Sequence, residues 1–424
     1  MKILFDRPVI PGLGKKYVAI DGKFIVTVTD DRPEGEFDRV ICCNNRLLMP
    51  GLYNCHTHAA MTLFRGYGEE LPLHRWLQER IFPAEERLTN RAVYAASMLA
   101  AAEMIGSGIV SFTDMYNFNE ETVSAVLETG MKANISRAVL SFDPGADPAK
   151  DERVLEGIRL FECCHGLGDG RVRIDMSLHA EYTNQRSYCE YIAHYAKANG
   201  AGIHIHLSET EAEHKEGIER RGMTPAEFFA DTGVFDVPVT AAHCVWISDS
   251  DMALMAKKGV TVAHNPASNL KLGSGIMPLE KVLAAGVNVT LGTDGTASNN
   301  RLDILREMYL AAILHKGVNR RADCIAAGEI IKMATVNGAK SQGRADCGRI
   351  EAGCRADIIL LDLDTVSNIP MYEPEYTVLF SASSADVRMT MADGKVLYEN
   401  GEYTTLDIEH IKHELRYVCE HYFD

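Results

Sequence analysis

The chain has 424 residues, 46% of them hydrophobic and 24% charged, and its formal net charge is −16. The length suits one barrel of about 250 residues plus a smaller module, and the acidic balance argues against nucleic acid as a partner. No apolar run reaches the ~18 residues of a membrane span, and the eleven cysteines form no CxxC pair, so we expect a cytoplasmic protein with reduced thiols and no membrane partner.

The amino-terminal stretch, residues 1–49, reads as several short strands separated by turns, such as those at Pro11-Gly12 and Asp21-Gly22. Eight apolar, strand-like runs follow, and segments with helical spacing lie between them. The runs are Leu47–His58, Gly108–Asp114, Met131–Leu140, Arg171–His179, Ala201–Glu209, Val237–His243, Gly259–His264 and Val287–Asp294. The clearest helical segments are Asn90–Ile105, Ser187–Ala198, Asp251–Lys258, Pro278–Ala285 and Asp303–His315.

Strands that alternate with helices favour a parallel sheet, and eight such units favour closure into a barrel. After the barrel, Gly348–Leu363 and Val387–Tyr398 again read as strands, and an amphipathic helix spans about Asp407–His421. We predict an α/β protein, a (β/α)₈ TIM barrel with a small β-sandwich built from both chain ends. Residues 52–348 form the predicted metal-dependent barrel, and residues 1–51 and 349–424 form the predicted sandwich.

Polar residues end several of these runs, at the place where barrels carry their catalytic groups. His56 and His58 lie two residues apart in an extended chain, so both imidazoles share a face and can bind one ion. His204 and His206 form a second pair of this kind. We favour His206 as the ligand because it lies nearer the end of its strand.

Three further residues complete a candidate site. Glu209, three residues after His206, is placed to take a proton from a water molecule that a metal activates. His243 ends the sixth strand and is expected to form a hydrogen bond to that water. Asp294 follows the eighth strand and adds a carboxylate oxygen to the three imidazoles. This set of ligands suits one divalent ion, Zn²⁺, with Fe²⁺ as the alternative.

The blocks PGLYNCHTH, HLSET, AAHC, HNPASN and LGTDG resemble the signature blocks of the amidohydrolase superfamily, over nearly the whole chain. They are most similar to the branch of 5'-methylthioadenosine/S-adenosylhomocysteine deaminases. The resemblance implies that His56, His58, His206 and Asp294 bind the metal and that Glu209 moves protons. It also implies that His243 polarises the attacking water.

Binuclear members of the superfamily have a carboxylated lysine at the end of the fourth strand, whereas this chain has the sequence SLHAE at residues 177–181. The resemblance therefore implies a single metal and deamination of a ring. The family usually has a proline shortly after the position of His179, and this chain has Ala180-Glu181 instead.

The resemblance further implies a set of substrate contacts. Glu85 falls at the position that holds ribose hydroxyls, His179 at the position that contacts the purine, and Trp76 where the pocket has a wall. Arg137 and Arg153 fall where the homocysteine carboxylate is held.

We predict a hydrolytic deaminase, an enzyme that cleaves a non-peptide C–N bond in a cyclic amidine. Its substrate would be 5'-methylthioadenosine, S-adenosylhomocysteine, adenosine or 5'-deoxyadenosine, and its products a hypoxanthine analogue and ammonia. The alternative within the superfamily is a deaminase or hydrolase of guanine, a pterin or a triazine. A non-catalytic metal-binding protein is the alternative from another class, although such a protein has no need of Glu209. The resemblance also implies a homo-oligomer, either a dimer or a tetramer.

Overall fold

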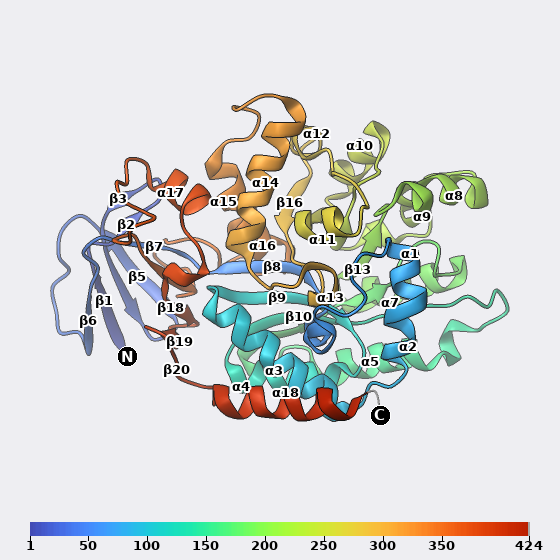
Figure 1. Cartoon of the computed structure of the whole chain (residues 1–424), viewed down its shortest axis with the longest axis horizontal. Coiled ribbons are helices and arrows are strands. Elements are labelled where there is room, and N and C mark those ends of the chain that lie inside the picture. The colour runs from blue at the N-terminus through green and yellow to red at the C-terminus, as the bar shows by residue number, and fades with distance from the viewer. Residues whose placement is uncertain (423–424) are drawn as a thin grey trace.

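The computed structural model describes residues 1–422 and shows a β-sandwich beside a larger barrel of strands surrounded by helices (Figure 1). Every barrel strand coincides with part of one of the eight predicted runs, and only β9 continues beyond its run, to Tyr116. The strands are β8 (Leu52–Thr57), β9 (Ile109–Tyr116), β10 (Lys132–Arg137), β11 (Val172–Ile174), β12 (Met176–Leu178), β13 (Ile203–Leu207), β14 (Val239–His243), β15 (Thr261–His264) and β16 (Asn288–Leu291).

All of these strands pair in parallel, in the orders β11-β10-β9-β8 and β12-β13-β14-β15-β16. The fourth strand is divided between the two sheets at Asp175, whose amide donates to the carbonyl of Ile135 at 3.0 Å. At the other seam, the amides of Thr293 and Asp294 donate to the carbonyl of His56 at 3.1 and 2.9 Å. These bonds place the end of the last strand directly beside the end of the first.

Helices follow the barrel strands, and every helical segment predicted above is present. The longer helices are α3 (Asn90–Gly106), α4 (Asn119–Thr129), α5 (Glu152–Cys164), α7 (Arg186–Asn199), α8 (Glu211–Arg221), α9 (Pro225–Asp231), α10 (Asp249–Lys258), α14 (Ile304–Asn319), α15 (Ala327–Ala334), α17 (Pro374–Phe380) and α18 (Ile408–Tyr422). Gly259 ends α10 in the left-handed conformation (φ 70°), as its position in the sequence predicts.

Shorter helices lie mainly in the loops. They are α1 (Leu73–Trp76), α2 (Phe82–Glu85), α6 (Leu167–Gly170), α11 (Pro266–Lys271), α12 (Leu279–Ala284), α13 (Thr296–Asn299) and α16 (Val336–Ser341). The 3₁₀ turns are η1 (Ala59–Phe64), η3 (Pro148–Lys150), η4 (Val234–Asp236) and η5 (Ser384–Asp386). Between α1 and α2 lies one π-helical segment, η2 (Leu77–Ile81), and such segments are frequent near functional sites.

The sandwich combines strands from both ends of the chain in two sheets. One sheet contains β1 (Lys2–Asp6), β4 (Tyr17–Asp21), β5 (Phe24–Thr29) and β6 (Arg39–Cys42). The other contains β2 (Val9–Ile10), β3 (Gly14–Lys15), β7 (Arg46–Pro50), β17 (Ile358–Asp362), β18 (Val387–Ala392), β19 (Lys395–Glu399) and β20 (Glu402–Tyr403). Buried apolar side chains of both sheets, such as Phe5 and Leu360, form one core. The predicted fold class is therefore confirmed, and the division at residues 51 and 348 stays a prediction.

Gly51 marks the crossing from the sandwich to the barrel, between β7 and β8. A side chain at this position would collide with Val110 on β9, which explains the glycine. The first predicted run is divided here, because β7 ends at Pro50 and β8 begins at Leu52. Near the other end of the chain, α18 packs against α3 of the barrel (Figure 1). Within residues 1–422, no helix is long and apolar enough to cross a membrane.

Candidate metal centre and active site

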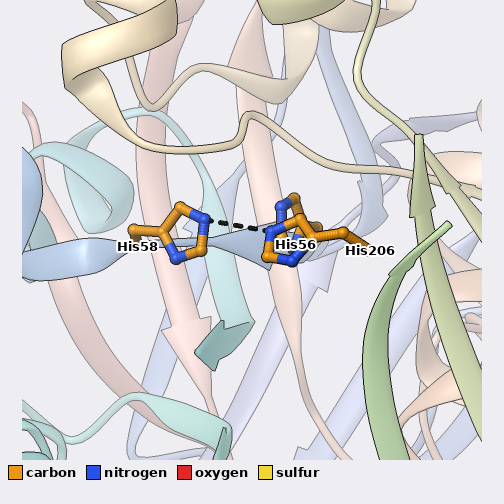
Figure 2. Close-up of side chains that lie close together, drawn as sticks. All are labelled: His56, His58 and His206. Carbon is orange, nitrogen blue, oxygen red and sulfur yellow. Dashed lines mark hydrogen bonds between the residues drawn. The ribbon is translucent and has the colours of Figure 1, made fainter. Parts of the chain in front are cut away.

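The carboxyl ends of β8, β13 and β16 bring four predicted ligands together. The Nε2 atom of His58 lies 3.4 Å from Nε2 of His206 and 3.3 Å from Oδ1 of Asp294, and Nε2 of His56 lies 3.5 Å from the same oxygen. Figure 2 shows the imidazoles of His56, His58 and His206 converging. The ligand atoms of these three histidines lie within 4.8 Å of one another, as do those of His56, His243 and Asp294.

In His58 and His206, the hydrogen bonds that Nδ1 forms away from the cluster show which ring nitrogen carries the proton. Nδ1 of His58 lies 2.5 Å from the carbonyl oxygen of Met115, and Nδ1 of His206 lies 2.7 Å from that of His179. A carbonyl oxygen only accepts, so both Nδ1 atoms donate. In the neutral rings both Nε2 atoms therefore carry lone pairs, as metal-binding histidines require.

The side chains of this cluster need a cation among them to compensate for their converging lone pairs and negative charge. The two Nε2 lone pairs face each other and a carboxylate oxygen, with no hydrogen atom between them. Burial lowers the pKa of His56 to about 4 and holds the pKa of His206 well below its ordinary value, so both rings are neutral near pH 7. Nε2 of His56 is buried and has no hydrogen-bond partner among residues 1–422. Three imidazole nitrogens and one carboxylate oxygen match the ligand set that Zn²⁺ prefers.

Asp294 is oriented by its own neighbours. Its backbone adopts the left-handed conformation (φ 60°), which a non-glycine residue seldom adopts and which is typical of functional sites. The hydroxyls of Ser268 and Ser298 donate to Oδ2 at 2.6 and 2.9 Å, and the amide of Gly295 donates to Oδ1 at 2.7 Å. These bonds leave a lone pair of Oδ1 directed at the histidines.

The structure separates the two candidates on β13. His206 joins the cluster, whereas His204 lies deeper along the strand, with its Nε2 atom 2.9 Å from Nδ1 of His56. His204 therefore supports the ring of His56 on the side away from the cluster. Of the two, His206 is the one that lies among the other predicted ligands, and its role as a metal ligand stays a prediction.

Glu209 and His243 lie beside the cluster. The carboxylate of Glu209 accepts a hydrogen bond from the hydroxyl of Ser274 at 3.0 Å, and burial raises its pKa. Nε2 of His243 lies 3.8 Å from Oε2 of Glu209, while its Nδ1 lies 2.7 Å from Oδ1 of Asn269. An amide oxygen only accepts, so Nδ1 of His243 donates, and Nε2 can accept when the ring is neutral. Burial lowers the pKa of His243, but the carboxylates of Glu209 and Asp294 outweigh it and raise this pKa above its ordinary value.

Sequence reasoning missed the residues that hold these groups. Ser268 and Asn269 belong to the block HNPASN, and Ser274 lies five residues after it, but the resemblance gives none of the three a role. That block supplies the partners of Asp294 and His243, so the resemblance was the only available signal for them.

A small pocket of about 80 Å³ opens beside the cluster and contains three of the predicted substrate residues. Its lining includes Trp76, Glu85 and His179, together with His206 and Glu209. Burial raises the pKa of Glu85 to about 7, opposed by the neighbouring Tyr116 hydroxyl and the charge of Arg137. A group that changes its charge near neutral pH therefore lies in the wall of the pocket.

The two predicted arginines lie farther out, in a cavity of about 560 Å³. This cavity shares Glu85 and Leu140 with the small pocket, so the two spaces adjoin. Arg137 donates through Nε to Glu156 at 2.5 Å and through Nη1 to Asn117 at 2.6 Å. The only hydrogen bond from the guanidinium of Arg153, among residues 1–422, is 3.1 Å long and goes to the carbonyl of Leu140.

Glu181, one of the two residues Ala180-Glu181 that stand where the resemblance leads us to expect a proline, forms ion pairs with two arginines. Its buried carboxylate accepts from Nη2 of Arg220 at 2.7 Å and from Nε of Arg221 at 2.8 Å. Both arginines belong to the last turn of α8. The departure from the family pattern thus ties the loop that carries His179 to the helix that follows Glu209.

Comparison with known proteins establishes the family. A model of the amidohydrolase family matches residues 47–397 of the chain. The chain belongs to the amidohydrolase family. Both the predicted family and the predicted class, a hydrolase of C–N bonds, are confirmed.

Several proteins resemble this amidohydrolase over most of their length. It is 42% identical over 412 residues to the 5-methylthioadenosine/S-adenosylhomocysteine deaminase of Acetivibrio thermocellus, covering 96% of this chain and 94% of that protein. It is 42% identical over 401 residues to the 5'-deoxyadenosine deaminase of Methanosarcina acetivorans, covering 94% of this chain and 91% of that protein. The zinc-bound crystal structure of an adenosine deaminase from Xanthomonas campestris has a TM-score of 0.94 at 28% identity, and the match covers 100% of this chain and 98% of that one.

Proposed function

We propose that this amidohydrolase removes the 6-amino group of an adenine nucleoside, forming the hypoxanthine analogue and ammonia. The observation that carries the proposal is the convergence of three imidazoles and one carboxylate beside Glu209, at a pocket that adjoins a larger outer cavity. Relatives at 42% identity are named as deaminases of adenine nucleosides, and they support the choice of substrate.

His56, His58, His206 and Asp294 would hold one divalent metal, which we propose to be Zn²⁺, with Fe²⁺ as the alternative. When bound, such an ion is a Lewis acid that lowers the pKa of a coordinated water molecule to about 7. The chain has Ser177-Leu178-His179 at the end of the fourth strand and no lysine there to bridge a second ion. This supports a site for a single metal.

The protein groups would then move protons between water and substrate. Glu209 takes one proton from the attacking water and delivers it to the ring nitrogen next to C6, and the raised pKa of Glu209 suits both transfers. Nε2 of His243 accepts a hydrogen bond from the attacking water and orients it. A new C–O bond forms at C6 while the C–N bond breaks. The second proton of the water leaves on ammonia, assisted by Asp294.

The pocket residues would position the nucleoside. We assign the ribose hydroxyls to Glu85, a contact with the purine to His179, and one wall of the pocket to Trp76. The 5'-substituent would extend into the outer cavity, where Arg137 and Arg153 could pair with the carboxylate of S-adenosylhomocysteine. Arg137 already has three protein acceptors, so Arg153 has more donors left for a ligand.

Ammonia release from a substrate panel tests the proposal. The panel contains adenosine, 5'-methylthioadenosine, 5'-deoxyadenosine and S-adenosylhomocysteine, with guanine, a pterin and a chlorinated triazine as competitors. We expect one ammonia per hypoxanthine product from at least one nucleoside. Turnover of guanine, the pterin or the triazine alone would replace this proposal with the alternative. The cytoplasmic location and the dimeric or tetrameric state stay predictions from the sequence.

The raised pKa of Glu85 predicts a specific pH dependence of binding. Only the ionised carboxylate accepts hydrogen bonds from both ribose hydroxyls, and this form is lost as the pH falls through about 7. We expect inhibition by the nucleoside product to weaken by about tenfold per pH unit below 7. Inhibition by the free base hypoxanthine, which lacks ribose, is the matched control. Glu85→Gln should remove the difference in pH dependence between the two inhibitors, and an unchanged difference would exclude Glu85 as the ribose contact.

A further inference from the structure

Helix α8 begins two residues after Glu209, and an acidic residue in its first turn has an unusual set of partners. Thr210 is the N-cap, and its hydroxyl accepts from the amide of Glu213, the third residue of the helix, at 3.1 Å. The side chain of Glu213 is 6% exposed and lies in the wall of the small pocket.

Two neighbouring helices show how an acid at this position normally bonds. At α9, Thr224 caps the helix and Glu227, also the third residue, accepts from the amide of Thr224 at 2.8 Å. At α10, Asp251 accepts in the same way from the amide of Ser248 at 2.8 Å. In both capping boxes the acid returns to the N-cap residue of its own helix.

Glu213 reaches past its N-cap residue instead. Its Oε1 accepts from the amide of Ser208 at 2.9 Å, and its Oε2 accepts from the amide of Glu209 at 2.8 Å. One carboxylate thus holds two consecutive amides, the second of which belongs to the residue that we assign to proton transfer. A cap that served only α8 would not need these contacts.

The segment held by Glu213 is one that needs external support. Ser208 has φ 47°, a left-handed conformation that a side chain disfavours. Ser208 follows the last residue of β13, so this turn sets the direction in which Glu209 leaves the barrel strand.

Burying the carboxyl group of Glu213 also lowers the stability of the fold. Among residues 1–422, no lysine or arginine forms an ion pair with it, and burial raises its pKa to about 7. A buried acid without a cationic partner destabilises a protein unless hydrogen bonds compensate it. The far end of α8 is anchored by the bonds from Arg220 and Arg221 to Glu181, so the helix holds Glu213 in place.

We propose that Glu213 is a positioning residue for the deamination. It holds the amides of Ser208 and Glu209, and the hydroxyl of Ser274 holds the Glu209 carboxylate from the other side. The inference rests on the proposed function, because it gives Glu209 the proton-transfer role.

The test compares Glu213→Gln with Glu227→Gln, its counterpart in the capping box of α9. Glutamine has one acceptor oxygen, so E213Q can keep only one of the two amide bonds, and its NH₂ group opposes the other amide. We expect kcat of E213Q to fall about 10- to 100-fold with KM nearly unchanged, since a small misplacement of a reacting group has an effect of this size. E227Q should keep its kcat. If E213Q folds poorly, Glu213→Asp replaces it in the test. The shorter aspartate side chain cannot reach both amides, so kcat of this variant should fall by a similar factor.

Two further measurements separate positioning from simple stabilisation. Metal content should match the wild type in E213Q, and hydrogen exchange should increase in the peptide covering residues 206–212 of E213Q but not in E227Q. Unchanged kcat in E213Q, or a loss that only follows metal content or unfolding, would overturn the role of Glu213. A wild-type protein that releases no ammonia from any nucleoside would instead contradict the proposed function, and the exchange data would still show whether Glu213 holds the turn.

Discussion

Glu209→Gln should lower turnover by about 10²- to 10⁴-fold, the usual contribution of a general acid–base group. Glutamine retains an oxygen that can accept the hydrogen bond from Ser274, so the pocket keeps its shape. It cannot take a proton from water, nor can it return one to the purine ring. The measurement is kcat for ammonia release, accompanied by metal analysis and thermal unfolding of the same sample.

Glu211→Gln is the matched control for this substitution. Glu211 lies two residues later, is exposed, and among residues 1–422 forms an ion pair only with Lys215 on the surface of α8. E211Q should retain wild-type turnover. A Glu209→Gln protein with normal turnover would remove Glu209 from the mechanism, and one that loses its metal would show that Glu209 supports the metal centre instead.

Removal of the metal should abolish deamination, and added Zn²⁺ should restore it. The lone pairs of His58 and His206 face the carboxylate of Asp294, and no lysine or arginine among residues 1–422 forms an ion pair with that carboxylate. His206→Ala should therefore bind metal far more weakly than the wild type, because it removes one ligand. The readouts are bound metal per chain and ammonia release before and after dialysis against a chelator.

His315→Ala provides the control for the loss of a buried histidine. His315 on α14 contacts His264, and its ring is not part of the convergent cluster. H315A should keep its metal, although it loses some stability. Full activity of the metal-free protein would contradict the proposed catalytic role of the ion.

Much of the fold follows from local patterns in the sequence. Apolar runs that end in polar residues, separated by helical segments, predict parallel strands with their carboxyl ends on one side of a barrel. The alternation of side chains along a strand then explains why His56 and His58 share a face. Geometry along the chain also favours His206 over His204, because only the residue nearer the strand end reaches the cluster.

The supporting contacts do not follow from such patterns. The bond from Ser274 to Glu209 joins residues 65 positions apart, and its geometry depends on how two loops pack. The pattern Thr210-x-x-Glu213 is typical of a capping box, but Glu213 reaches past Thr210 to the amides of Ser208 and Glu209, and the pattern gives no indication of these contacts. The ion pairs of Glu181 with the arginines of α8 likewise join residues 39 and 40 positions apart, and no local pattern indicates them.

Anomalous diffraction from crystals of the zinc-loaded protein, collected at the zinc absorption edge, tests the central claim most directly. The account predicts one peak per chain, about 2.0–2.2 Å from the imidazole nitrogens of His56, His58 and His206 and from a carboxylate oxygen of Asp294. Two neighbouring peaks at this cluster, or a single peak bound by other residues, would contradict it.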